Sequence, residues 1–215
     1  MKKLLGITAA CALTVSAFGQ GTVVFQNLTG LVKQWTSTSD GTLVSAPKGN
    51  AMVDLISAAP GVALANPLGV LSTPGGFALN YQTLGAFLAA NPGWHSEAVG
   101  GVNSANGIFN NGSVSLTGIA GGASAQYAVL GWSGTAATLD AAITGGAWVG
   151  ESAIFTTTTG DPGTTPPGTP INLKSTFTGI ILAPQAGAVP PVPEPATFAL
   201  VGLGAAAMLI FRRRK

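Results

Sequence analysis

The chain has 215 residues, of which 47% are hydrophobic and only 7% are charged. Between residues 20 and 189, three lysines (Lys33, Lys48 and Lys174) face six acidic residues, which leaves a net charge of −3. A body without a basic stripe argues against nucleic-acid binding, and its hydrophobic content argues against a disordered chain. We therefore expect one folded domain between two processed ends.

The first 19 residues have the three parts of a secretory signal peptide. Lys2 and Lys3 give the positive start, residues 4–15 the apolar stretch, and small residues follow. The stretch is too short for a membrane span of ~30 Å, and Cys11 lacks the preceding aliphatic residue of a lipid-attachment box. We expect the Sec translocon to export the chain and signal peptidase to remove residues 1–19, leaving a body without cysteine.

Short strand-like runs separated by turn residues follow the signal. In residues 125–132 both alternating faces are apolar, which predicts a strand covered on each side. In residues 112–119, Val114 and Leu116 alternate with serine and threonine, which predicts a half-exposed strand. The six predicted strands are residues 21–27, 51–57, 112–119, 125–132, 152–158 and 176–182.

Two segments have helical spacing instead. Residues 82–90 stop at Asn91-Pro92-Gly93, and residues 138–144 begin with Thr138 as N-cap and stop at two glycines. Residues 156–170 predict a loop. We expect residues 20–189 to form an all-β domain, a β-sandwich of immunoglobulin-like or jelly-roll-like type with one or two short helices.

Few residues in the body offer catalytic chemistry. His95 is the only histidine, and we expect it in a solvated loop beside Trp94. No nucleophile, zinc or phosphate-binding motif is present, and a carboxylate pair for glycoside hydrolysis would have to come from dispersed acids. Asp161 could serve a calcium site but is more typical of a turn. We expect no enzyme activity, cofactor or metal.

Other side chains leave two interpretations open. An exposed tryptophan can stack on a sugar ring, whereas a buried one fills a β-sandwich core. Trp132 and Trp148 favour the core, and Trp35 and Trp94 favour neither. Asn27 and Asn111 begin glycosylation sequons, although Asn-Gly-Ser at residues 111–113 is also an ordinary turn.

The C-terminal end differs in composition from the body. Residues 190–195 contain four prolines, which predict an extended linker. Residues 196–211 are an apolar run about 24 Å long as a helix, a marginal transmembrane helix. The basic tail of Arg212, Arg213, Arg214 and Lys215 would stay in the cytoplasm by the positive-inside rule.

Val192-Pro193-Glu194-Pro195-Ala196-Thr197, followed by an apolar helix and a basic tail, resembles the PEP-CTERM protein-sorting signal. The resemblance implies an exported protein of an exopolysaccharide-producing bacterium. It also implies recognition of Pro193-Glu194-Pro195 by exosortase, an integral-membrane enzyme with a cysteine-based, sortase-like site. Cleavage nearby would release the body or transfer it to the cell surface.

These observations predict three parts: a signal peptide (1–19), an exported β-rich domain (20–189), and a linker with the sorting signal (190–215). The predicted function is a non-enzymatic cell-surface or matrix protein of the bacterial envelope, associated with exopolysaccharide. It is held in the membrane by its C-terminus until it is sorted. Two alternatives stay open: an envelope hydrolase with a dispersed carboxylate pair, and a membrane-tethered protein that is never cut.

Overall fold

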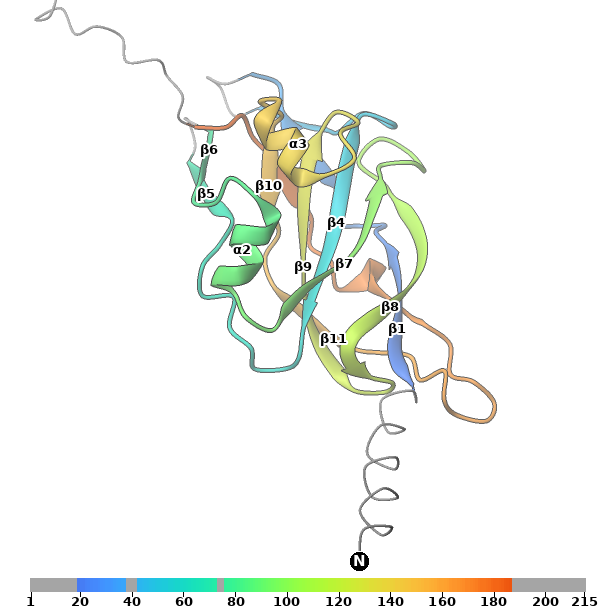
Figure 1. Ribbon diagram of the computed structural model, residues 1–215. Coiled ribbons are helices and arrows are strands. Elements are labelled where there is room, and N and C mark those ends of the chain that lie inside the picture. The colour runs from blue at the N-terminus through green and yellow to red at the C-terminus, as the bar shows by residue number, and fades with distance from the viewer. Residues whose placement is uncertain (1–18, 38–41, 73–75, 187–215) are drawn as a thin grey trace, which may run out of the picture. The chain divides into compact units, whose positions relative to one another are not determined.

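The computed structural model of the protein describes residues 19–37, 42–72 and 76–186. A five-stranded sheet crosses the middle of this body (Figure 1). Its strands run in the order β10 (Val149–Glu151), β9 (Ser124–Ser133), β4 (Ala51–Ala58) and β7 (Trp94–Gly101), and β11 (Phe155–Thr158) pairs with the first half of β9. All of these pairings are antiparallel.

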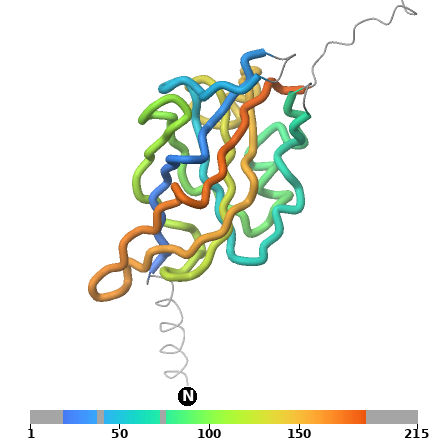
Figure 2. The backbone as a smooth tube through the Cα atoms, turned by 180° about the vertical axis from the view of Figure 1, so that it is seen from behind, coloured from blue at the N-terminus to red at the C-terminus, as the bar shows by residue number. Residues whose placement is uncertain are grey.

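Three smaller sheets complete the β structure. One has the order β12 (Ile171–Asn172), β1 (Gln20–Gln26), β8 (Asn110–Ala120), and another the order β13 (Ile180–Leu182), β2 (Val32–Trp35), β3 (Leu43–Ser45). The third is the hairpin of β5 (Gly69–Ser72) and β6 (Gly76–Leu79). The late strands β12 and β13 pair in parallel with the early strands β1 and β2, so segments far apart in sequence lie side by side (Figure 2).

The two α-helices among the described residues lie close to their predicted positions. α2 (Leu84–Ala90) and α3 (Leu139–Thr144) begin after Thr83 and Thr138, whose side chains accept hydrogen bonds from backbone amides in the first turn. The Asp140 carboxylate of α3 accepts a hydrogen bond of 2.6 Å from the Leu84 amide, which joins the starts of the two helices. A short 3₁₀ helix, η2 (Leu173–Ser175), precedes β13.

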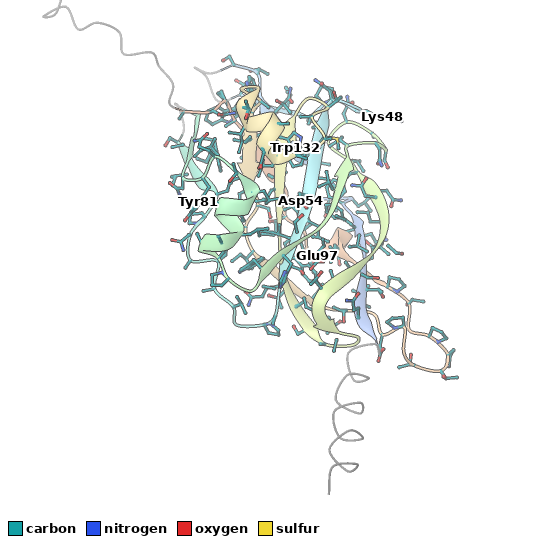
Figure 3. All side chains as sticks on the ribbon, in the orientation of Figure 1. Lys48, Asp54, Tyr81, Glu97 and Trp132 are labelled. Carbon is teal, nitrogen blue, oxygen red and sulfur yellow. The ribbon has the colours of Figure 1, made fainter. Side chains whose placement is uncertain are left out.

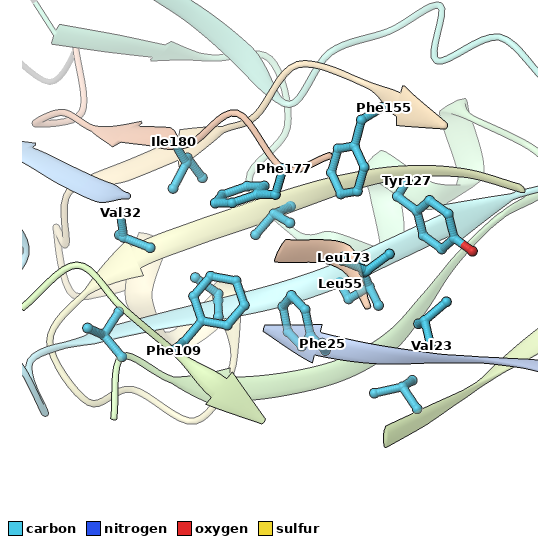
Figure 4. Close-up of a cluster of buried hydrophobic side chains, with 14 of the residues drawn as sticks. Val23, Phe25, Val32, Leu55, Phe109, Tyr127, Phe155, Leu173, Phe177 and Ile180 are labelled. Carbon is cyan, nitrogen blue, oxygen red and sulfur yellow. The ribbon is translucent and has the colours of Figure 1, made fainter. Parts of the chain in front are cut away.

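Apolar side chains cover both faces of the five-stranded sheet. On one face they pack against β1 and β8 and include a group of aromatic rings (Figure 4), namely Phe25, Phe109, Tyr127, Phe155 and Phe177. On the other face, Ala128, Leu130 and Trp132 of β9 pack against residues of α2 and α3. This arrangement confirms the prediction that the central strand at residues 125–132 is covered on each side.

Four of the six predicted strands match β1, β4, β8 and β9. Residues 152–158 do not form one strand. Ser152 lies between β10 and β11, and its hydroxyl accepts a hydrogen bond from the Val129 amide, which interrupts the strand pairing with β9. Residues 176–182 form a strand only from Ile180, since Gly179 has a φ of 112° just before it. A mostly β body with two short α-helices is confirmed, while the sandwich type stays a prediction.

Candidate functional site

The last described segment carries the chain toward the predicted sorting signal. After β13, Ala183 exchanges two backbone hydrogen bonds with Val149, and the Phe77 amide donates one of 2.7 Å to the Pro184 carbonyl. The Gln185 side chain donates to the carbonyls of Ile143 and Ala147 at 2.9 and 3.0 Å. The body therefore holds the chain up to Gln185.

The predicted sorting residues lie outside the described residues. These are the motif of Val192, Pro193, Glu194, Pro195, Ala196 and Thr197, the helix at 196–211, and the tail of Arg212, Arg213, Arg214 and Lys215. Residues 1–18 of the predicted signal peptide lie outside them as well.

Asp54 is a fully buried acid in the middle of β4. Strand alternation places it on the face that Ile56 and Ala58 share with the helices. The Ser96 hydroxyl lies 2.9 and 3.0 Å from the two carboxyl oxygens of Asp54, which is labelled in Figure 3. Burial raises the pKa of Asp54 to about 7, while the Ser96 hydrogen bond lowers it and the charge of Glu97 raises it further.

Glu97 lies at a β-bulge, where the register between β4 and β7 shifts. Its carboxylate accepts hydrogen bonds from the Ser57 hydroxyl at 2.6 Å and from the Thr117 amide and hydroxyl at 3.0 and 2.9 Å. Ser57 belongs to β4 and Thr117 to β8, which lies in another sheet. Glu97 therefore joins two sheets through charge-assisted hydrogen bonds.

Asp54 and Glu97 do not form a carboxylate pair around one cleft. Asp54 belongs to the helix-covered face, whereas the partners of Glu97 lie on the side of β8. Two carboxylates that flank a glycosidic bond must face the same space. These two lie on opposite faces of the sheet between them.

Glu151 at the end of β10 lines a cleft of about 360 Å³. Its Oε2 accepts a hydrogen bond of 2.8 Å from the Leu68 amide, and its Oε1 is buried without a hydrogen-bond partner. Burial raises the pKa of Glu151 to about 7, against the lowering effect of the Leu68 hydrogen bond. The cleft also contains Lys33, so it combines one acidic and one basic residue with walls that are about equally polar and apolar.

The structure places His95 and the tryptophans more definitely than the sequence does. His95 is exposed, as expected, but it lies in strand β7 and not in a loop, because the β4 backbone offers residues 94–101 a pairing partner. Trp35, Trp94 and Trp132 are at most 2% exposed, so they fill the core. Trp148 is only partly buried and packs against both apolar clusters.

The first sequon asparagine is unsuited to glycosylation because its side chain is part of the core. Asn27 is 3% exposed, donates hydrogen bonds to the carbonyls of Gly30 and Gly107, and accepts one from the Phe109 amide. Asn111 is partly buried, its Oδ1 accepts a hydrogen bond from Asn103, and its Nδ2, the atom that would carry a glycan, is buried. Neither side chain is free to carry a glycan.

Asp161 behaves as a turn residue. Its Oδ1 accepts a hydrogen bond of 2.9 Å from the Gly163 amide two positions along the chain, the pattern of an Asx turn. Within residues 19–37, 42–72 and 76–186, no three metal-ligating side chains gather at one place.

Residues 191–215 match the model of the PEP-CTERM protein-sorting motif. The match confirms the resemblance read from residues 192–197, although it covers only the C-terminal part of the chain. The motif implies an exported protein of the bacterial envelope that an exosortase-like enzyme sorts after C-terminal membrane anchoring. No curated protein and no solved structure matches the chain.

The described part of the body contains the helices α2 and α3 and the short 3₁₀ helix η2. None of the helices there is long and apolar enough to cross a membrane. The predicted transmembrane helix at residues 196–211 lies outside that part.

Proposed function

We propose that the protein is a non-enzymatic component of the cell surface or extracellular matrix. An exosortase cleaves it near Pro193-Glu194-Pro195, and its body then associates with extracellular polysaccharide. The observation that carries the proposal is the sorting-motif match at residues 191–215. For the body we infer a β-sandwich, supported by the aromatic cluster between the five-stranded sheet and the sheet of β1 and β8.

Two features of the body support a binding role over catalysis. The acids on neighbouring strands, Asp54 and Glu97, lie on opposite faces, which disfavours the alternative of a hydrolase with a carboxylate pair. In addition, Ser113 and Ser115 of β8 are exposed, so the strand offers hydroxyl groups to the solvent. Such a polar strand suits hydrogen bonding to a hydrated polymer better than it suits a closed reaction site.

Mass spectrometry of the mature protein from an exosortase-producing host tests the sorting step. We expect a C-terminus near residues 192–197 and loss of the helix and the basic tail. An intact tail ending at Arg212–Lys215 would contradict the proposal and support the second alternative, a tethered protein that is never cut. An exosortase-deficient host is the control, because the tail should remain there.

Cosedimentation tests polysaccharide association separately. The released protein should pellet with the exopolysaccharide of its own host and not with an unrelated neutral polymer. If it stays in solution with both, the association with polysaccharide is wrong, whatever the outcome of the sorting experiment.

A further inference from the structure

Exposed aliphatic side chains lie on two hairpins at one end of the body, on both faces of strands β3 and β5. Leu43 and Val44 of β3 are 39% and 41% exposed, and Val70 and Leu71 of β5 are 54% and 38% exposed. Leu43 and Leu71 line the same cleft, so the hairpins β2–β3 and β5–β6 meet around it. We call Leu43, Val44, Val70 and Leu71 the exit patch.

The chain leaves the body beside this patch. Phe77 of β6 lines the same cleft as Leu43 and Leu71, and its backbone forms a parallel bridge with Gln185. Figures 1 and 2 agree that the two hairpins and the end of the described chain lie at one end of the body, and that the start of β1 lies at the other.

The chain beyond Gln185 is short before its apolar run begins. Residues 186–195 are ten residues, four of them proline, and a polyproline chain extends about 3.1 Å per residue. In the anchored state that the sorting motif implies, this end of the body stays within about 30 Å of the membrane interface. Such tethering gives a high effective concentration, so even a small apolar patch can bind the bilayer.

The charge around the patch also suits a bilayer. Lys33 lines the cleft and is exposed, and it pairs in register with Ile181, which also lines the cleft. Aliphatic side chains beside a lysine are the combination that binds at an anionic lipid interface. Glu151, the one acid among the cleft's lining residues, has its Oε1 buried, so it opposes headgroup binding less than an exposed carboxylate would.

We propose that, before sorting, the exit patch and Lys33 contact the surface of an anionic lipid bilayer. The aliphatic side chains enter the interface, and Lys33 binds the lipid headgroups. This contact would hold the body at the membrane surface and so keep the linker close to the membrane, where we propose that it is cut. The inference rests on the anchored state of the proposed function and adds a binding surface on the body.

Site-specific fluorescence on the full chain tests this contact. Val70→Cys and the control Val99→Cys, both with Cys11→Ser, carry an environment-sensitive dye in vesicles of phosphatidylcholine and phosphatidylglycerol with brominated acyl chains. Val99 is a matched control because it is 44% exposed and lies on β7, the sheet edge opposite β10. We expect the bromines to quench the dye at position 70 at least twofold more strongly than the dye at position 99.

Further variants separate the contributions of the patch and the charge. Leu71→Gln should reduce the quenching at position 70 on all vesicles. Lys33→Gln should reduce it on vesicles with phosphatidylglycerol and leave it unchanged on pure phosphatidylcholine.

Flotation of the vesicles separates the possible failures. If the chain does not float with vesicles after alkaline washing, the anchored state is wrong, and this inference fails with it. If the chain floats but positions 70 and 99 are quenched equally, the membrane contact is wrong while the proposed sorting stands. A third outcome is that the dye at position 70 is shielded from water without being quenched by bromine, and that this shielding increases with the number of protein molecules per vesicle. This result would assign the patch to a contact with a second copy of the chain and would also overturn the proposal.

Discussion

Asp54 places an ionisable group among apolar neighbours at the centre of the body. Its pKa of about 7 lies above the ordinary value of 3.8 for an aspartate because burial disfavours the charged form. The folded state therefore keeps a proton that the unfolded chain releases between these two values. The free energy of unfolding falls as the pH rises through this window, by at most about 1.4 kcal/mol per pH unit.

The substitution Asp54→Asn should remove this pH dependence while keeping an acceptor for the Ser96 hydroxyl. We expect the variant to exceed the unmodified protein in stability by about 1–3 kcal/mol at pH 8, with little gain at pH 4. Urea unfolding at the two pH values measures the effect. Ser96→Ala is the opposing control, because losing its hydrogen bond should raise the pKa of Asp54 further and extend the loss of stability to higher pH. A variant that is less stable at pH 8 would contradict the burial argument.

Among the elements, the link between β7 and β8 depends on one side chain. Removing the Glu97 carboxylate leaves Ser57 and the Thr117 amide and hydroxyl without their acceptor. We expect Glu97→Ala to cost about 2–4 kcal/mol in the free energy of unfolding, and Glu97→Gln about half of that. Amide hydrogen exchange should accelerate first at Thr117. Unchanged protection there would mean that the Glu97 hydrogen bonds are not needed to hold β8 beside β7.

The elements also show which parts of the fold the sequence can predict. Residues 125–132 and 112–119 were predictable because alternation reports burial directly, and Thr138 was predictable because an N-cap is a local signal. Strand β7 was not, since its residues 94–101 lack an apolar alternation and form a strand through pairing with β4. The short strands β2, β3, β5 and β6 depend in the same way on neighbours distant in sequence.

The candidate sites also differ in how far the sequence could predict them, according to whether they depend on local or on long-range features. The sorting signal was predictable, because Pro193-Glu194-Pro195, an apolar run and a basic tail are all local features of the sequence. The burial of Asp54 and Glu151 was only weakly indicated by the sequence, in which each is a single acid within a short apolar segment. The cleft could not be predicted from the sequence, because Lys33, Leu71 and Glu151 come together only through the packing of separate sheets.

For the whole molecule, Asp54 and Glu151 change the pH dependence of stability in the same direction. Both carboxyl groups have a pKa raised to about 7 by burial, so the folded body gains stability as the pH falls toward 5. We expect a higher thermal midpoint at pH 5 than at pH 8. The double variant Asp54→Asn with Glu151→Gln should reduce this difference by more than either single change. Equal midpoints of the unmodified protein at both pH values would contradict the prediction.

The sorting of the whole chain should depend on the single charge of its linker. Glu194 is the only charged residue between Lys174 and Arg212, so an enzyme that reads the proline segment from outside the membrane has one carboxylate to recognise. A carboxylate forms stronger hydrogen bonds to a charged donor than an amide does. We expect Glu194→Gln to leave export and signal-peptide removal intact while the uncut form accumulates at least tenfold in the membrane fraction.

Pro190→Ala is the matched control, since it changes the same linker just outside the matched residues 191–215. This variant should be sorted like the unmodified chain. Immunoblotting of membrane and extracellular fractions, with an intact mass for each form, distinguishes the two results. Normal release of Glu194→Gln would show that the enzyme reads backbone shape from the prolines and not the charge between them. Equal stalling of both variants would assign recognition to the stiffness of the whole linker.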